Sequence, residues 1–255
     1  MNAVTLARNL SIVFEQIEAT SSVTGRLMPR LVAVSKTKSV DLIVEAYRCG
    51  QRHFGENYIQ EFVIKSNDSV ILDQCPDIRW HFIGKIQSNK INKLVSCPNL
   101  YMVETVDSEK CARMLNSARE KVITDRKVQV NTSNEDQKSG VSESEAYELA
   151  DYIVGNCAHL IFAGFMTIGS LAHSLSVATS DAAGSCGNDL RSEGNPDFVA
   201  LRNLRDRYCD FRAIEPETIE LSMGMSADFC DAIRHGATSV RVGSTIFGAR
   251  DMKQL

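Results

Sequence analysis

Short runs of apolar, β-branched residues recur along the chain and alternate with segments that have a helical pattern. Apolar runs of this length, bounded by turn residues, are typical of strands buried in a sheet. They predict eight strands, at residues 31–35, 53–55, 80–84, 101–105, 128–131, 161–166, 220–223 and 239–242. The helical spacing predicts helices at residues 4–19, 40–48, 57–65, 88–95, 108–122, 143–154, 196–209 and 227–234.

Strands that alternate with helices indicate a parallel sheet covered by helices. Eight such units in 255 residues match a (β/α)8 barrel and leave little remainder. The alternative is an open doubly wound sheet, but its usual Gly-x-Gly-x-x-Gly turn is absent because the first strand runs into Ser35-Lys36-Thr37-Lys38-Ser39. We therefore predict an α/β protein, a single (β/α)8 TIM barrel over residues 1–255 with an extra N-terminal helix.

Residues 169–196 do not follow this pattern. The segment is rich in Ser, Gly, Ala and Asn and has no firm periodicity. Because it follows the sixth predicted strand, it would leave the barrel at the rim where such folds carry their active sites. A lid over the site is one interpretation; we favour the simpler one, a flexible, solvated insertion.

Composition excludes several classes of function. A formal net charge of −4 provides no basic surface for nucleic acid, and no segment approaches the roughly 20 apolar residues that span a bilayer. Glu15 and Glu18 interrupt what would otherwise pass for a transit peptide, so we expect a cytoplasmic protein and leave a mitochondrial pool open. The eight cysteines are scattered without a Cys-x-x-Cys pair, which predicts reduced thiols and no metal site.

The polar residues at the predicted strand ends are the candidates for chemistry, because strand C-termini build the site of a barrel. They are Lys36, Glu56, Asn57, Tyr58, His81, Glu104, Thr105, Asn131, Thr167, Ser222 and Arg241. Taken singly they have simpler explanations. A strand-end lysine is often a solvated surface residue, His81 beside Trp80 is more often a satisfied core histidine than a base, and Glu56 and Asn57 could only cap a helix.

The last two strands add an anion site to this rim. Gly224-Met225-Ser226 precedes a helix for which Ser226 is a good N-cap, and Gly243-Ser244 leads from the last strand into a short helical segment. Backbone N–H groups at such turns bind phosphate, and the loops after strands seven and eight of barrels often do so. One lysine beside a phosphate site suggests a phosphorylated aldehyde held as a Schiff base, with pyridoxal 5′-phosphate (PLP) the leading candidate. A sugar-phosphate aldolase would share both features.

Several motifs resemble the pyridoxal phosphate homeostasis proteins, the YggS/PROSC family, in order and at compatible spacing from about residue 30 to residue 250. They are "LVAVSKTKS", "HFGENYIQE", "WHFIGKIQSNK", "VETVDS", "VNTSNEDQKSG", "MTIGS", "ELSMGMSADF" and "VRVGSTIFGAR". The resemblance implies a monomeric barrel similar to the N-terminal domain of alanine racemase, which binds, buffers and delivers PLP, with PLP-dependent apo-enzymes as recipients.

The resemblance also assigns residues. It places the cofactor lysine at Lys36, the phosphate turns at Ser226 and Gly243-Ser244, and the arginine that faces the pyridine nitrogen at Arg241. By the same analogy the pocket is lined by Asn57, Met166, Thr167 and Met223.

A PLP-dependent amino-acid racemase is the alternative to a non-catalytic carrier. Two-base racemisation needs an acid or base on each face of the ring. In the racemase a second domain supplies one of these two groups. We expect no such domain after Leu255, so here Tyr58, His81 or the insertion would have to supply the second acid or base. We favour the carrier. Lys38 and Lys138 could serve as cations that steer the anionic cofactor inward, but we favour the simpler interpretation that both are solvated lysines.

Overall fold

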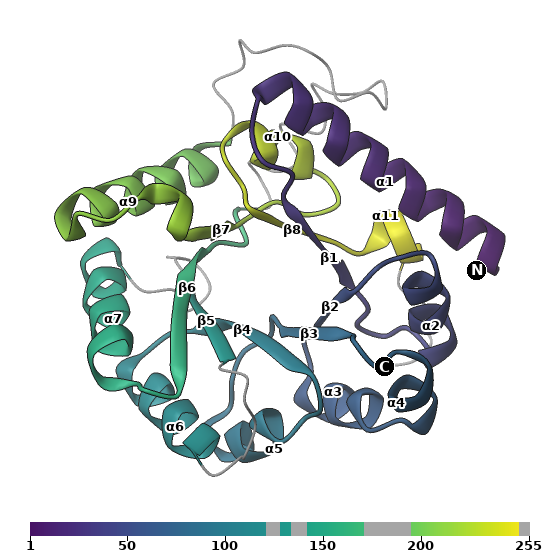
Figure 1. Ribbon diagram of the computed structural model, residues 1–255, viewed down its shortest axis with the longest axis horizontal. Coiled ribbons are helices and arrows are strands. Elements are labelled where there is room, and N and C mark those ends of the chain that lie inside the picture. The colour runs from purple at the N-terminus through teal and green to yellow at the C-terminus, as the bar shows by residue number, and fades with distance from the viewer. Residues whose placement is uncertain (121–127, 134–141, 171–194, 250–255) are drawn as a thin grey trace.

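The computed structural model describes residues 1–120, 128–133, 142–170 and 195–249. Their strands form one closed barrel in which every neighbouring pair is parallel (Figure 1). The strands are Arg30–Val34 (β1), His53–Glu56 (β2), Arg79–Phe82 (β3), Leu100–Val106 (β4), Val128–Ser133 (β5), Leu160–Met166 (β6), Glu220–Ser222 (β7) and Ser239–Val242 (β8). Because β8 pairs with β1, the sheet has no open edge. The (β/α)8 barrel is confirmed, and the open sheet is excluded.

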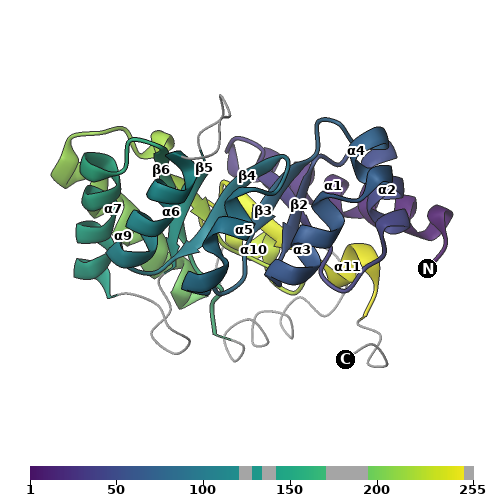
Figure 2. The same cartoon turned by 90° about the horizontal axis from the view of Figure 1, so that it is seen from below.

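The helices surround the barrel on its outside (Figures 1 and 2). They are Val40–Arg48 (α2), Ile59–Ser66 (α3), Ser69–Gln74 (α4), Ile91–Val95 (α5), Glu109–Glu120 (α6), Glu143–Asn156 (α7), Pro196–Arg212 (α9), Phe229–Arg234 (α10) and Ser244–Phe247 (α11), with short 3-10 turns at Ser88–Lys90 (η1) and Pro216–Thr218 (η2). The sequence pattern missed α4 and η2, because six and three residues are too few to show a helical period.

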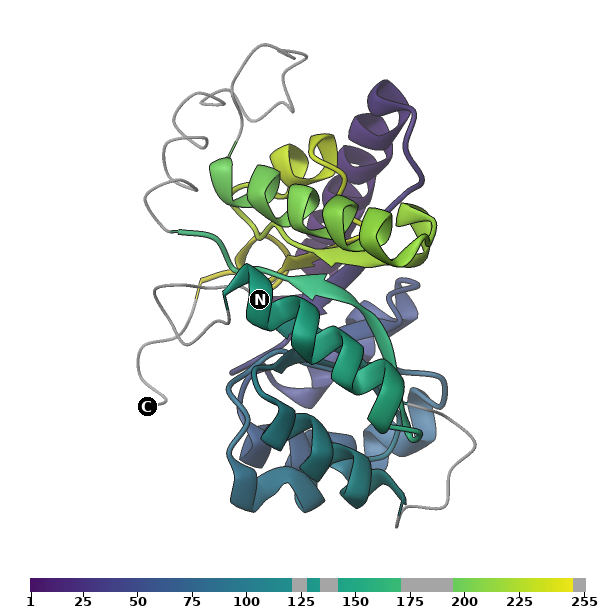
Figure 3. The same cartoon turned by 90° about the vertical axis from the view of Figure 1, so that its left-hand side faces the viewer.

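The N-terminal helix Ala3–Thr24 (α1) takes the place of a full eighth barrel helix. The helix that follows β8, α11, has only four residues and leaves the outside of β8 and β1 poorly covered. Helix α1 packs against α10, α11 and α2 with a buried stripe at helical spacing, Leu6, Leu10, Val13 and Ile17 (Figures 1 and 3). The predicted extra helix is therefore part of the barrel's outer layer.

The apolar core lies between the sheet and the helices, and strand alternation decides which residues join it. On β3, Trp80 and Phe82 face outward and pack against Phe62 of α3, with ring centroids 5.6 and 6.3 Å apart. His81, which lies between them, faces the barrel interior and is fully buried. The barrel interior thus receives polar residues that a reading of the strand ends had placed at the rim.

No helix in the described part of the chain is long and apolar enough to cross a membrane, and the same residues contain no group of three or more His, Cys, Asp or Glu side chains able to hold a metal ion. Six cysteines are free thiols, of which only Cys49 is exposed. Cys230 on α10 is disulfide-bonded, so the prediction of reduced thiols is wrong there. A disulfide joins residues that the fold brings together, which sequence spacing does not reveal.

Candidate functional site

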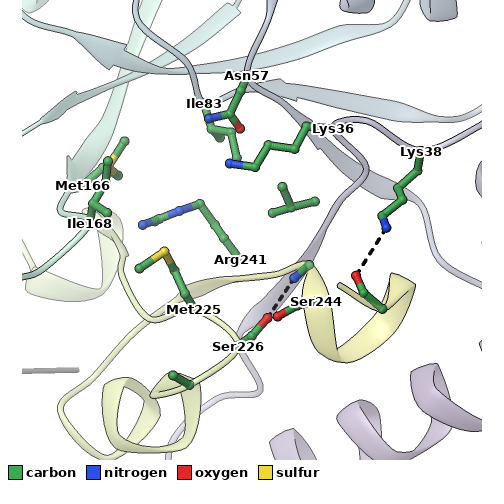
Figure 4. Close-up of a pocket in the computed structure, with 14 residues that line it drawn as sticks. Lys36, Lys38, Asn57, Ile83, Met166, Ile168, Met225, Ser226, Arg241 and Ser244 are labelled. Carbon is green, nitrogen blue, oxygen red and sulfur yellow. Dashed lines mark hydrogen bonds between the residues drawn. The ribbon is translucent and has the colours of Figure 1, made fainter. Parts of the chain in front are cut away.

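A pocket of about 380 Å³ opens at the C-terminal ends of the strands. It is lined by Val34, Lys36, Lys38, Asn57, Ile83, Met166, Ile168, Met225, Ser226, Ala227, Arg241, Gly243, Ser244 and Gly248 (Figure 4). Its volume is within the range of small-molecule sites, and its mixture of apolar walls with a few polar groups is typical of them. Of the nine residues that the resemblance assigns to the site, all but Thr167 and Met223 belong to this lining.

Lys36 follows β1 in a segment that a buried ion cluster anchors on both sides. The Lys65 ammonium of α3 donates to the Ser35 carbonyl at 2.7 Å and to Glu56 Oε1 at 2.8 Å. After Lys36, Thr37 has a φ of 63° and donates its N–H to Glu61 Oε1 at 2.6 Å. A β-branched residue in the left-handed region is strained, and such strain persists only where surrounding contacts enforce it. The Lys36 side chain points into the pocket (Figure 4).

Asn57 is held by a close approach of two backbones. A Cβ at Gly84 would lie 1.8 Å from the Asn57 carbonyl oxygen, so only glycine fits there. Thr105 fixes the same turn, because its hydroxyl donates to the Gly84 carbonyl at 2.6 Å. Asn57 Oδ1 is buried and has no hydrogen-bond partner among the described residues. A buried acceptor left open beside a pocket is suited to a ligand donor.

The loops after β7 and β8 form one side of the pocket. Gly224 turns the chain with a φ of +89°, and a Cβ there would lie 2.4 Å from Ala232 Cβ. Ser226 was predicted as an N-cap, but α10 begins only after Asp228. The Ser226 hydroxyl instead accepts the Gly243 N–H at 3.1 Å and so joins the two loops (Figure 4).

Ser226, Ala227 and Ser244 line the pocket together, and their backbone N–H groups are candidates to bind an anion. Within the described chain, none of the three donates to a protein acceptor. Backbone donors of this kind, converging at turns, are the usual protein partners of a phosphate group.

Arg241 reaches the pocket from β8 and is 4% exposed. Its guanidinium donates from Nη1 to Ser222 Oγ and from Nη2 to the Thr167 carbonyl, both at 2.7 Å. Thr167, predicted to line the pocket, is not part of the lining and acts through this carbonyl.

Met223, also predicted to line the pocket, lies away from it. It is fully buried in the core between sheet and helices, because it follows Ser222, whose hydroxyl faces the barrel interior. His81 and Glu104 also lie in the interior and not at the rim, and Tyr58 is 49% exposed and outside the lining. Three apolar lining residues, Ile83, Ile168 and Met225, were not predicted, although each lies within two residues of a predicted strand end.

Of the two lysines considered for steering the cofactor, Lys38 belongs to the described residues and Lys138 does not. Lys38 lines the pocket, but its ammonium donates to the carbonyls of Ala249 at 3.0 Å and Gly248 at 3.3 Å. Figure 4 shows the side chain directed at the Gly248 carbonyl. Lys38 therefore fastens the segment after α11 to the pocket rim. Lys138, Asn131's side chain and most of the 169–196 segment lie outside the described residues.

Comparison with known proteins places the chain in a family. Residues 9–251 match the family described as alanine racemase, N-terminal domain. The pyridoxal phosphate homeostasis protein of Bos taurus is 48% identical over 229 residues, which cover 88% of this chain and 78% of the relative. The chain belongs to the pyridoxal phosphate homeostasis protein family. The resemblance of its motifs is thereby confirmed.

Solved structures agree with membership of the homeostasis family. PipY of Synechococcus elongatus PCC7942, in a structure with PLP bound, is 27% identical with a TM-score of 0.72, covering 95% of this chain and all of PipY. Alanine racemase from Streptomyces coelicolor A3(2) has a TM-score of 0.66 at 14% identity, covering 97% of this chain and 58% of the racemase. At that identity the similarity to the racemase concerns the fold alone.

Proposed function

We propose that this protein binds PLP in the pocket at the C-terminal end of the barrel and acts in PLP homeostasis as a carrier. One observation supports this most directly: Lys36 lines the same cavity as Ser226, Ala227 and Ser244, whose backbone N–H groups have no acceptor in the described chain. A lysine amine forms a Schiff base with an aldehyde, and the N–H groups suit the phosphate of the same molecule. The PLP ring then lies between Lys36 and the phosphate site, where Asn57 Oδ1 and Arg241 are its polar partners.

The carrier role is favoured over the racemase alternative by what lines the pocket. A two-base mechanism needs an acid or base on each face of the ring. Apart from Lys36, the titratable lining residues of the described chain are Lys38, held by carbonyls, and Arg241, which stays charged. The two side chains considered as a second base, Tyr58 and His81, do not reach the pocket. The relatives named as homeostasis proteins agree with this choice.

The test is reduction of the purified protein with borohydride after addition of PLP. A visible absorption band that borohydride removes, with the adduct mapped to Lys36 by peptide mass spectrometry, is expected for the wild type and for Lys93→Ala, an exposed lysine on α5. Lys36→Ala should show neither band nor adduct. An adduct spread over surface lysines, or one that persists in Lys36→Ala, would refute the assignment. Racemisation of an amino acid by the loaded wild type would replace the carrier with the enzyme.

Delivery is the finer part of the proposal. We propose a monomeric, cytoplasmic protein that passes PLP to PLP-dependent apo-enzymes, since the family resemblance points to that role. Light scattering gives the oligomeric state directly. Loading of an apo-enzyme by the PLP-bound protein should exceed loading by the same concentration of free PLP when a PLP scavenger is present. Equal loading would mean that the protein only buffers PLP.

A further inference from the structure

A chain of hydrogen-bonded side chains crosses the interior of the barrel and ends at the pocket arginine. Each member comes from a different strand, namely His53 of β2, His81 of β3, Glu104 of β4, Ser222 of β7 and Arg241 of β8. The successive contacts are His53 Nδ1 to His81 Nε2 at 2.8 Å, His81 Nδ1 to Glu104 Oε1 at 2.6 Å, Ser222 Oγ to Glu104 Oε2 at 2.5 Å and Arg241 Nη1 to Ser222 Oγ at 2.7 Å. Barrel interiors are usually filled with branched apolar side chains, so a polar row here has a specific task.

The donors of this row converge on Glu104. At one end, Arg79 can only donate, so His53 accepts at Nε2 over 3.4 Å and donates from Nδ1 to His81. His81 in turn donates from Nδ1 to Glu104. At the other end, Arg241 donates to Ser222, and the Ser222 hydroxyl donates to the second carboxylate oxygen. Each oxygen of the Glu104 carboxylate thus accepts one hydrogen bond.

The charges agree with this direction. Burial alone would raise the pKa of Glu104, but the hydrogen bond from His81, the charge of Arg241 and the hydrogen bond from Ser222 together lower it, so the group is a carboxylate. Burial, followed by the charges of Arg30 and Arg79, lowers the pKa of His53 to about 2, so this ring is neutral.

Arg241 needs such a partner. A guanidinium that is 4% exposed is costly unless a nearby opposite charge and good hydrogen bonds compensate for its lost hydration. The guanidinium donates to the Ser222 hydroxyl and the Thr167 carbonyl, which are both uncharged groups. Glu104 is fully buried and reaches Arg241 through one intervening oxygen atom, Ser222 Oγ, which makes it a counter-ion of the guanidinium.

We propose that Glu104, braced by His81 and acting through Ser222, is a positioning residue that fixes the charge and direction of Arg241 in the pocket. The consequence for ligand binding rests on the proposed function, because Arg241 is expected to contact PLP. Glu104 itself touches no ligand. It lies inside the barrel, so its effect on affinity has to pass through the guanidinium. That dependence separates a positioning role from a general contribution to folding.

The experiment is a double-mutant cycle on PLP affinity. Glu104→Gln keeps the shape but removes the charge, and one of its amide hydrogens then competes with the donors already present. We expect a Kd about tenfold higher, the loss of roughly one charge-assisted hydrogen bond, with borohydride still fixing PLP to Lys36. In an Arg241→Gln background, Glu104→Gln should change the Kd by less than about twofold. An equal effect in both backgrounds overturns the proposal.

Two further measurements keep the test decisive. If Glu104→Gln folds poorly, Ser222→Ala replaces it in the test. Ser222→Ala removes only the bridging hydroxyl and should raise the Kd for PLP by a similar factor. Leu149→Ala, in the α7 core, should lower the melting temperature without changing the Kd. If the wild type fails to fix PLP at Lys36, the proposed function falls. The positioning role is then decided by crystal structures of Glu104→Gln, where an Arg241 guanidinium still bonded to Ser222 and Thr167 overturns it.

Discussion

Lys65→Met removes the cation from the cluster that anchors the Lys36 segment. The Lys65 side chain is 6% exposed and the Glu56 side chain is fully buried. A second carboxylate, Glu61, lies 2.6 Å from the same ammonium and is 23% exposed. Removing one partner of a buried pair leaves the other charge uncompensated, which costs about 3–5 kcal/mol. A domain of this kind is stable by only about 5–15 kcal/mol, so the loss should be plain in urea unfolding.

The pH dependence distinguishes this mechanism from lost packing. Burial raises the pKa of Glu56 above 4.5, and the charge and hydrogen bond of Lys65, with the hydrogen bond from Ser35, offset only part of that rise. Without Lys65 the pKa rises further. A carboxyl group with a raised folded pKa contributes stability below its unfolded pKa and loses that contribution as the pH rises through the folded value. The deficit of Lys65→Met should therefore be small at about pH 5 and large at about pH 8.

The assay is urea unfolding of the wild type and variants at both pH values. Lys65→Met/Glu56→Gln, which removes the stranded charge, should recover much of the stability at the higher pH. Arg207→Met breaks an exposed pair with Glu143 and should cost less than about 1 kcal/mol. A deficit that is equal at both pH values, with no recovery in the double variant, would refute the reasoning. PLP should also react with Lys36 more slowly in Lys65→Met, since the segment loses its anchor.

Two other residues give independent tests. Gly84→Ala forces a Cβ to within 1.8 Å of the Asn57 carbonyl and should cost about 3 kcal/mol and weaken PLP binding in a fluorescence titration; Gly155→Ala, with nothing within 4 Å, should do neither. A hydrogen bond with Asp231 raises the pKa of His235 above 6.5. His235→Gln should therefore show its stability deficit below pH 6.5, shrinking as the pH rises through the raised value, and a deficit independent of pH contradicts this.

The order of the strands and of the longer helices was predictable because each of these elements shows a local hydrophobic period; α4 and η2 were too short to do so. The helix at Val40–Arg48 and the strand at Ser239–Val242 have the bounds that the pattern predicted. Closure of the barrel was an inference from eight repeats, and the β1–β8 pairing confirms it. What local pattern could not supply was the role of α1, which depends on α11 being only one turn long.

The pocket was partly predictable for a related reason. Residues at the C-terminal ends of parallel strands must meet at one rim, which brings Lys36, Asn57 and Arg241 together. Which face of a strand each side chain takes depends on alternation and on the register between strands. For this reason Met223 lies in the core outside the sheet. His81 lies in the barrel interior beside Glu104, as a satisfied core histidine, which was the favoured interpretation.

The sequence by itself determined the repeating strand and helix units, the lysine at the end of the first strand, the glycine turns near the phosphate side and the family. These are properties of short segments, which carry their own backbone preferences and motifs. Only the tertiary structure decided that Ser226 joins two loops, that Lys38 binds carbonyls and that Glu104 is the counter-ion of Arg241. Hydrogen bonds and charge compensation in a closed barrel depend on distances between strands far apart in sequence, and no local pattern encodes those distances.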